Sequence, residues 1–249
     1  MFQNIGEILL LLWRTLCSFP QLWRQRRKIF EQLFEIGNRS LLMACILSLF
    51  IGGVVSLQSG PVLAERGIAN ALGGLVGISL AKELSPVMMA VLIAGRIGSA
   101  MAAEIGSMRV YQEIDALKTM NINPIHYLVL PRLVAICVAV PMLVVFSMLV
   151  GWLGGGFVAV ANHRIALTFQ TFFSNLQDVV QLKHVINGLI KSLAFAFVIG
   201  TVSCHQGLTT IGGPRGIGRS VTKAVVNSIV LVLILDYYLT RVLLPFDHD

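Results

Sequence analysis

The chain has 249 residues, of which 56% are apolar and only 12% are charged, and its mean hydropathy is +0.81. An ordinary soluble domain carries about 25% charged residues, so this composition excludes a soluble enzyme, a disordered chain and a disulfide-stapled secreted domain. In so apolar a chain, the net charge of +7 indicates basic residues at a membrane face and no nucleic-acid partner.

Residues 1–37 are predicted to form an interfacial, amphipathic helical segment ahead of a membrane domain over residues 38–249. From residue 5 onward, apolar side chains recur at helical intervals between arginines and lysines, and Pro20 is expected to separate two short helices. A basic helix of this kind that carries tryptophan lies in the headgroup plane of a membrane. A helix packed on the domain in water is the alternative.

Five segments are long and apolar enough to span a membrane as helices. Residues 40–64 carry no charge over 25 positions, which is sufficient to cross a hydrocarbon core about 30 Å thick. The fold class is therefore predicted as an all-α integral membrane protein with an N-terminal interfacial helix and five transmembrane helices. The other four spans are expected at residues 67–96, 133–162, 184–210 and 223–246.

The distribution of Lys and Arg predicts the orientation of these spans. With the N-terminus in the cytoplasm, 13 of these basic residues flank the inner ends of the spans and four flank the outer ends. Cytoplasmic segments carry the excess of Lys and Arg. The N-terminus is therefore expected inside and the C-terminus outside.

The second span ends with small residues in two rows at four-residue spacing. Such rows let helix backbones approach closely in lipid, where no hydrophobic force drives helices together. They predict a packed partner helix, either within this chain or in a second copy. The predicted packing positions are Gly95, Gly98, Ser99, Ala102 and Gly106.

A polar segment, residues 104–124, separates the second and third spans. Residues 108–120 are predicted to form a short helix with Tyr111, Ile114 and Leu117 on one side. A short helix that two long spans hold at the membrane face is suited to docking into another protein. A solvated connector is the alternative.

Four charged residues, Lys82, Glu83, Lys191 and Asp236, fall inside the predicted spans. Ionisable residues within a membrane are costly and mark function by default. Lys82 and Glu83 point about 100° apart on a helix, which does not favour a pair between them. The hypothesis is that Lys191 neutralises Glu83 or Asp236 across helices. The alternative is that these charges only hold the helix bundle together.

Other motifs do not indicate chemistry in this chain. Residues 213–220 imitate the spacing of a phosphate-binding loop, but a preceding strand and the phosphate-binding lysine are missing. They are predicted to form a basic, glycine-rich turn. The cysteines and histidines show no metal-ligand or catalytic spacing, so no metal site, no catalytic residue and no cofactor are predicted on this chain.

The central sequence resembles the MlaE family, the permease subunits of ABC transporters that move lipids together with MCE-domain proteins. Plastid lipid-import permeases are relatives. The resemblance covers the chain from about Glu31. The motifs that carry it are Lys-Glu-Leu-Ser-Pro at residues 82–86, the glycine- and alanine-rich residues 94–108, Glu-Ile-Asp-Ala-Leu at 113–117, Ile-Lys-Ser at 190–192 and the glycine-rich residues 212–219.

The resemblance implies a homodimer, each subunit carrying a cytoplasmic coupling helix that fits a groove on an ABC ATPase. The polar segment then becomes this coupling helix, at about residues 106–121. An MCE-domain protein is the expected partner on the outer side, and ATP and magnesium belong to the ATPase. The residues expected to couple are Glu104, Met108, Tyr111, Glu113, Ile114, Asp115 and Leu117.

In the family, the lipid cavity lies at the dimer interface, and the resemblance implies that the first, second and fifth spans line it here. The apolar outer halves of the first two spans suit acyl chains. The expected lipid-path residues, besides the four intramembrane charges, are Val54, Leu57, Leu72, Leu75 and Leu80.

The predicted function is that of a permease subunit that moves phospholipid or a related lipid, with ATP hydrolysis on a separate subunit, so this chain is not itself an enzyme. The alternative is an ion-coupled secondary transporter that uses Glu83, Lys191 and Asp236, and a third possibility is a membrane scaffold. A bacterial inner membrane is favoured over a plastid inner envelope, because no transit-peptide pattern precedes the first helix.

Overall fold

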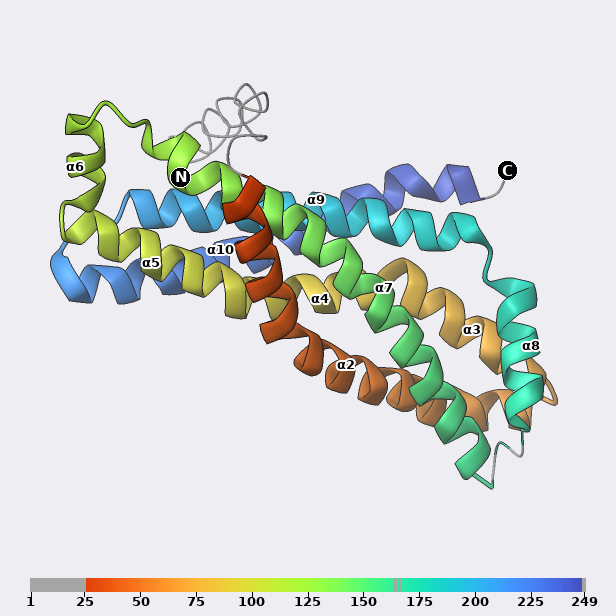
Figure 1. The fold of residues 1–249 in the computed structure, drawn as a ribbon. Helices are drawn as coiled ribbons and strands as arrows, with labels where there is room; N and C mark the ends of the chain where they lie inside the picture. Colours follow the sequence, from red (N-terminus) through yellow and green to blue (C-terminus); the bar gives the residue numbers. More distant parts are fainter. Residues whose placement is uncertain (1–25, 164, 166, 248–249) are drawn as a thin grey trace. The chain divides into compact units, whose positions relative to one another are not determined.

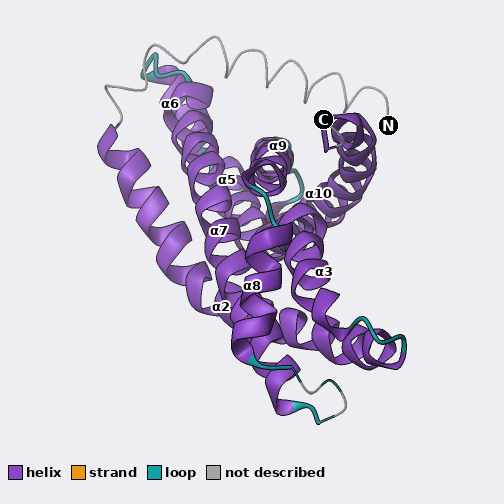
Figure 2. Cartoon of the chain, turned by 90° about the vertical axis from the view of Figure 1, so that its right-hand side faces the viewer, coloured by secondary structure: helices purple, strands orange, loops and turns teal. Residues whose placement is uncertain are grey.

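The computed structural model describes residues 26–163, 165 and 167–247. Within these ranges the chain is helical and contains no strand (Figure 2). The break predicted at Pro20 and the start of the interfacial segment lie outside the described residues.

Five helical stretches are long and apolar enough to cross a membrane, which confirms the predicted all-α fold with five spans. They cover Arg26–Glu65, Ala69–Val110, Ile125–Ala161, Leu182–Leu208 and Gly213–Leu243. Figure 1 shows the helices in chain order. Their bounds are α2 Arg26–Glu65, η2 Ala69–Ala71, α3 Leu72–Ser79, η3 Leu80–Leu84, α4 Ser85–Ile93, η4 Ala94–Gly98, α5 Ser99–Val110, α6 Glu113–Thr119, η5 Ile125–Val129, α7 Leu130–Ala161, α8 Phe169–Val179, α9 Leu182–Leu208, α10 Gly213–Leu243 and η6 Leu244–Asp247.

The first span and the segment before it form one element. Helix α2 runs without interruption from Arg26 to Glu65, so the boundary expected at residues 37 and 38 falls within a continuous helix. The charged first part of α2 is therefore a direct extension of the apolar span.

The second span is helical throughout but not uniformly α-helical. Two π-helical turns, η3 and η4, interrupt it at Leu80–Leu84 and Ala94–Gly98. A π-helical turn contains one extra residue, rotates the side chains that follow it, and occurs frequently at functional sites. The turn η3 contains both Lys82 and Glu83.

The described chain divides into two compact units, and every long helix contributes to both. The first unit contains residues 26–39, 90–140 and 193–236, and the second contains 40–89, 141–192 and 237–247. Each unit is described by itself below.

In the second unit, α3 packs against α8 over an apolar core (Figure 1). A side chain at Gly73 would collide with the backbone of Phe172, and one at Gly52 would collide with the backbone of Gly151. Glycine thus permits the backbones of α3 and α8, and those of α2 and α7, to touch. The buried core consists of Leu72, Val76, Leu80, Ala159, Ile165, Leu167, Phe172 and Leu176.

In the first unit, α5 packs on α9 through small residues. A Cβ atom at Gly207 of α9 would lie 2.7 Å from Ile105 Cβ of α5, and one at Gly98, the last residue of η4, would lie 2.8 Å from Ser203 Oγ of α9. Helix α9 in turn packs on α7, where a Cβ atom at Gly200 would lie 2.7 Å from a Leu133 methyl carbon. This close approach is what the small-residue spacing predicts.

Three elements differ from the prediction. The short helix between the second and third spans begins at Glu113 and not at residue 108, because Tyr111 and Gln112 form a turn in which Gln112 has a φ of 62°. Residues 213–220 are the first turns of α10 and not a loop. Helix α8 was not predicted at all. Its start is capped by Thr168, whose hydroxyl accepts a hydrogen bond from the Thr171 amide at 3.3 Å.

Candidate functional site

Glu83, Lys191 and Thr240 form a polar cluster within the second unit. The ammonium of Lys191 donates to Glu83 Oε2 and to Thr240 Oγ1, both at 2.7 Å. The Thr240 hydroxyl lies 3.2 Å from Glu83 Oε1, to which it donates. Three helical elements, η3, α9 and α10, therefore each supply one member of a closed hydrogen-bonded ring.

The burial of the two charges is unequal. The Lys191 side chain is only 3% exposed, whereas that of Glu83 is 40% exposed. A buried ammonium is tolerated only with an anion and hydrogen-bond acceptors around it, and the cluster provides both. The structure thus pairs Lys191 with Glu83, one of the two partners considered from the sequence.

The cluster borders a small cavity of about 60 Å³ that Lys82 and Asn187 also line. A cavity of about 10–15 Å³ already holds one water molecule, so this one accommodates several waters or a small polar group. Its other walls are Leu243 and Leu244. The remaining intramembrane charge, Asp236, belongs to the first unit and lies one helical turn before Thr240 on α10.

The expected lipid-path residues divide into two groups. Val54, Leu57 and Leu75 are exposed on the chain, so acyl chains can reach them. Leu72 and Leu80 instead lie in the apolar core and are almost fully buried. These two leucines are buried because α3 packs on α8, and Leu72 and Leu80 share one apolar core with Ala159 and Phe172.

The small residues that end the second span also occupy two different faces. Gly98, Ala102 and Gly106 are buried in the first unit, where Gly98 faces α9 and Gly106 faces Thr210 just after the end of α9. Gly95 is exposed and Ser99 is partly exposed, and no heavy atom of the described chain lies within 4 Å of a Cβ atom placed on Gly95. The row that includes Gly98 therefore packs within the chain, and the row that includes Gly95 lies on its surface.

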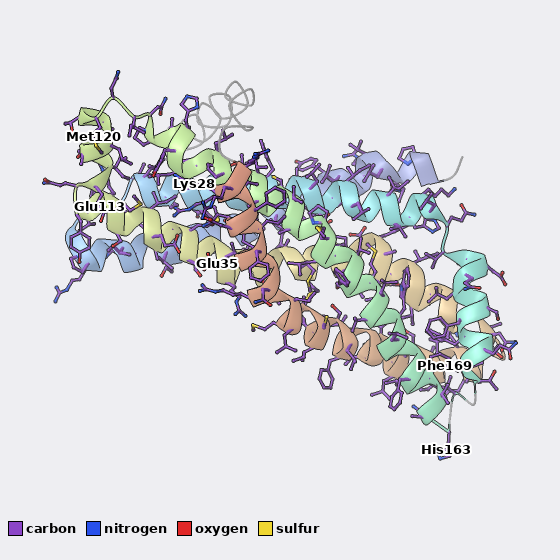
Figure 3. All side chains as sticks on the ribbon, in the orientation of Figure 1. Lys28, Glu35, Glu113, Met120, His163 and Phe169 are labelled. Atoms are coloured by element: carbon purple, nitrogen blue, oxygen red, sulfur yellow. The ribbon has the colours of Figure 1, made fainter. Side chains whose placement is uncertain are left out.

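The polar segment between the second and third spans presents α6 at the end of α5, as Figure 3 shows by the positions of Glu113 and Met120 at its two ends. Tyr111 and Glu113 are exposed and Leu117 is partly exposed. Ile114 is only 2% exposed and packs inward. Ile114 therefore packs α6 onto the rest of the chain, and its place in the expected docking set stays a prediction.

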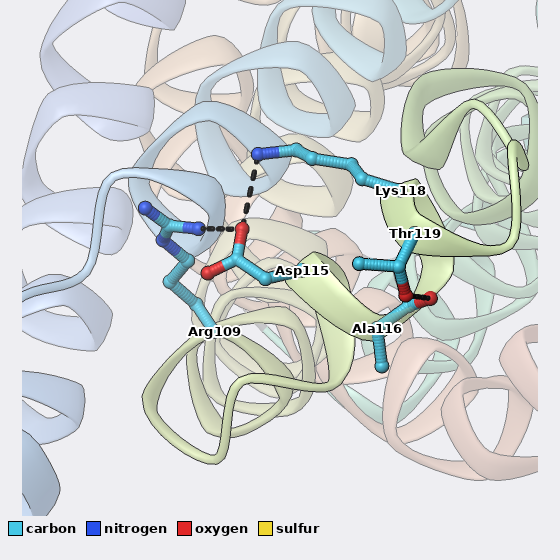
Figure 4. A network of polar contacts seen from close by, with 5 residues as sticks. All are labelled: Arg109, Asp115, Ala116, Lys118 and Thr119. Atoms are coloured by element: carbon cyan, nitrogen blue, oxygen red, sulfur yellow. Dashed lines mark hydrogen bonds and ion pairs between the residues drawn. The ribbon is translucent and has the colours of Figure 1, made fainter.

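Ion pairs fix the orientation of this segment (Figure 4). Asp115 accepts from Arg109 at 2.8 Å and from Lys118 at 3.1 Å. These interactions hold the pKa of Asp115 below its usual value of 3.8, and the hydrogen bond from Lys118 has the largest effect. Partial desolvation acts in the opposite direction and raises the pKa. In the middle of α5, Glu104 accepts from Arg132 of α7 at 2.8 Å, so two of the expected coupling residues are engaged within the chain.

Comparison with known proteins identifies the family. Residues 29–242 match the family model described as Permease MlaE. The chain belongs to the MlaE permease family.

Several relatives of this MlaE permease carry names that state a transport role. A probable ABC transporter permease protein of Synechocystis is 40% identical over 224 residues, which cover 90% of this chain and 84% of the relative. A probable ABC transporter permease protein of Rickettsia felis is 34% identical and covers 96% and 92% of the two chains. These similarities support the role of an ABC transporter permease in a membrane.

A plant relative is also similar. The chloroplastic protein TRIGALACTOSYLDIACYLGLYCEROL 1 of Arabidopsis thaliana is 33% identical over 214 residues. The match covers 86% of this MlaE permease and 61% of the plant protein. The family thus includes bacterial members and a chloroplastic one.

Sequence reasoning missed two parts of this MlaE permease that contribute to candidate sites. Thr240 carries no motif, and its only signal is its position four residues after Asp236, which places two polar residues on one face of an apolar helix. Arg132 was counted only as a basic residue at the end of a span, although its side chain is 12% exposed and bonded to Glu104.

Proposed function

We propose that this MlaE permease is the membrane subunit of an ABC transporter that moves phospholipid or a related lipid between the membrane and an MCE-domain partner. The observation that carries the proposal is the family match over residues 29–242. Five apolar helices give the chain a path through a bilayer, and ATP hydrolysis belongs to a partner subunit.

We infer that the chain acts as a homodimer in a bacterial inner membrane, with its N-terminus in the cytoplasm. The excess of Lys and Arg at one end of the spans supports this orientation. The exposed row of small residues that includes Gly95 supports contact with a second copy. Lipid would then pass along the exposed apolar side chains of Val54, Leu57 and Leu75.

The decisive experiment reconstitutes the complex, purified in mild detergent, into liposomes that contain a fluorescent phospholipid. Transfer of this lipid to a soluble MCE-domain protein should require ATP and should stop when the ATPase carries a hydrolysis-deficient substitution. Transfer by the permease alone at the same rate without ATP would contradict the proposal and favour an ion-coupled transporter.

Docking of the ATPase is proposed to occur at the exposed face of α6. The Glu113→Lys substitution should release the ATPase during size-exclusion chromatography, because a partner groove that accepts the acidic side chain would repel a cation. The Asp178→Lys substitution on α8 makes the same charge change at another exposed acidic residue and is the matched control. Retention of the ATPase by the Glu113→Lys protein would rule out this docking face.

The Glu83–Lys191 pair is proposed to act in transport and not only in assembly. A Glu83→Lys and Lys191→Glu exchange preserves the opposite charges but reverses their positions. We expect the exchanged protein to assemble with its ATPase and yet to transfer lipid much more slowly, because the cavity then presents the opposite polarity. Recovery of assembly and transfer together would show that the pair is purely structural.

A further inference from the structure

A second polar cavity lies between the start of α2 and the start of α7, within the first unit. Its volume is about 240 Å³, and its polar lining includes Lys28, Tyr127 and Arg132. A cavity of about 10–15 Å³ already holds one water molecule, so there is room for a group of several heavy atoms. The cavity plays no part in the proposed docking of the ATPase or in the Glu83 cluster.

Lys28 contributes a cation to this cavity. Its ammonium lies 3.2 Å from the centre of the Tyr127 ring, a cation–π contact that orients the side chain without neutralising its charge. Lys28 forms no ion pair with any residue in the described part of the chain. Its hydrogen-bond donors are therefore available to an anion.

Arg132 contributes a second cation with spare donor capacity. Its Nη2 atom donates to Glu104, but its Nη1 atom is buried and has no hydrogen-bond partner among the described residues. A guanidinium has five N–H donors in a planar fork that suits the oxygens of a carboxylate or phosphate. After its contact with Glu104, the guanidinium retains N–H donors that have no partner among the described residues.

Glu31 also lines the cavity, but its carboxylate is engaged by Arg27 at 3.1 Å. This pair reduces the repulsion that Glu31 would otherwise exert on an anion. Lys28 therefore faces the cavity together with Arg132, which is paired with Glu104, and Glu31, which is paired with Arg27. The positive charge of Lys28 is the one that no ion pair among the described residues offsets, which favours a ligand with a negative group.

The position of the cavity indicates that the ligand is a lipid. Arg132 directly precedes the uncharged residues 133–162, and α2 leads into the uncharged residues 40–64, so both walls lie next to the same end of two apolar spans. On the opposite face of α2, Phe30 and Phe34 are 68% and 72% exposed. Two exposed phenylalanines one turn apart indicate a helix at the depth of the membrane interface, where lipid headgroups are concentrated.

We propose that this cavity binds the phosphate group of a phospholipid headgroup through Lys28 and Arg132. Basic pockets between membrane helices are a recurrent way to hold such headgroups. The bound lipid would fasten the first part of α2 to the start of α7 at the membrane face. This inference does not rest on the proposed transport function, since a stably held lipid need not be the one that is moved.

The test uses the full chain, purified in mild detergent, stripped of lipid and titrated with a short-chain phosphatidylglycerol while native mass spectrometry counts the bound molecules. The Lys28→Gln variant should bind about ten-fold more weakly, because one charge-assisted hydrogen bond is lost. The Arg26→Gln variant removes an equal charge two residues away, at a position that does not line the cavity, and should bind like the unsubstituted chain.

Three results would overturn the proposal. Equal binding by the Lys28→Gln and Arg26→Gln variants would show only general attraction to basic residues. A diacylglycerol with the same acyl chains that binds as tightly as phosphatidylglycerol would show that the phosphate does not contribute to binding. Inorganic phosphate that competes at the same concentration as the lipid would identify a site for free phosphate.

The same titration separates this site from the transport path. The Glu83→Gln variant should keep the Lys28-dependent binding even where ATP-driven transfer is lost. Loss of the Lys28-dependent binding in the Glu83→Gln variant would place the lipid in the transport path and contradict a separate site. The Arg132→Lys variant keeps the charge but not the fork and should bind with an intermediate affinity.

Discussion

At the scale of single residues, Glu83 and Thr240 stabilise the buried charge of Lys191. Its ammonium is almost inaccessible, and Glu83 and Thr240 both lie 2.7 Å away. Removing the Glu83 carboxylate takes a hydrogen-bonded anion away from a buried cation, whereas removing the cation leaves a carboxylate that is partly exposed. The two single substitutions should therefore lower the free energy of unfolding by different amounts. Only a comparison with the double substitution isolates the interaction between Glu83 and Lys191.

A double-mutant cycle tests this inequality. The Glu83→Gln change should lower the free energy of unfolding by about 3 kcal/mol, because it removes the carboxylate that is paired with the buried Lys191 ammonium. The Lys191→Met change should cost less, and the double variant should be more stable than Glu83→Gln alone. Thr240→Val should cost about 1.5–3 kcal/mol, the range for a hydrogen bond to a charged group. Unfolding of the detergent-solubilised protein, followed by circular dichroism, measures each value, and strict additivity would contradict the pairing.

Asp115 gives a prediction about pH. Because the contacts with Lys118 and Arg109 lower its pKa below 3.8, the carboxylate stabilises the folded state above the unfolded pKa, and this contribution is lost as the pH falls through the lowered value. The difference in thermal midpoint between the unsubstituted protein and the Asp115→Asn variant should therefore be constant from about pH 5 to 8. It should vanish only in acid below pH 3.8. A difference that changes near neutral pH would show that another group titrates.

At the scale of elements, α8 is held on α3 by direct backbone contact. The absence of a side chain at Gly73 permits the carbonyl of Phe172 to lie against α3, and the amide of Gly74 donates to Asn175 Oδ1 at 2.7 Å. A methyl group at Gly73 would meet backbone, which cannot move aside as the end of a side chain can. The position of α8 therefore depends on glycines of α3, and Gly73 is the one at which an added Cβ atom would meet backbone.

The Gly73→Ala substitution should destabilise the fold by about 1–3 kcal/mol, the usual cost of overpacking. Gly37→Ala on α2 is the matched control, because a Cβ atom there has no heavy atom within 4 Å. In a helix interior this control should be neutral or stabilising by up to about 1 kcal/mol. Thermal unfolding in detergent distinguishes the two, and equal midpoints would contradict contact between α3 and α8.

The elements also show what the sequence could and could not predict. The five spans were predictable, because uncharged runs of sufficient length have no other stable environment. The turn before α6 was not predictable, because Gln112 adopts a positive φ without the glycine that marks most such turns. Helix α8 did have a signal, the Thr168 cap followed by Phe169, Phe172 and Leu176 on one face, but its length of 11 residues lies below that of a span.

Only the charged residues of the candidate site could be predicted from the sequence. The cost of ionisable groups in lipid singled out Glu83 and Lys191 before any geometry was known. The partner choice depended on the rotation of three helices, which hydropathy does not encode, and the π-helical turn η3 adds a rotation of its own. For the same reason, the sequence could not separate exposed Leu75 from buried Leu72 and Leu80.

At the scale of the whole molecule, the exposed small residues bear on how many copies assemble. Gly95 is exposed, and Ser99 and Ala103 are partly exposed. Because these residues are small, they offer little apolar area and gain little from contact with lipid. A helix from a second copy can approach this face closely and gain dispersion contacts and weak hydrogen bonds. The buried row that includes Gly98 is already occupied by α9, which leaves the Gly95 row as the surface available to a second subunit.

The Gly95→Leu substitution should therefore break the homodimer while leaving the single chain folded, because the added side chain meets open space within the chain but blocks the approach of a second helix. Light scattering after size-exclusion chromatography should report a dimer for the unsubstituted protein and a monomer for the variant, with equal helix content by circular dichroism. Val138→Phe adds a side chain of similar size on an exposed face of α7 and should leave the dimer intact. A Gly95→Leu protein that remains dimeric would exclude this face from the interface, and a monomeric unsubstituted protein would exclude the homodimer itself.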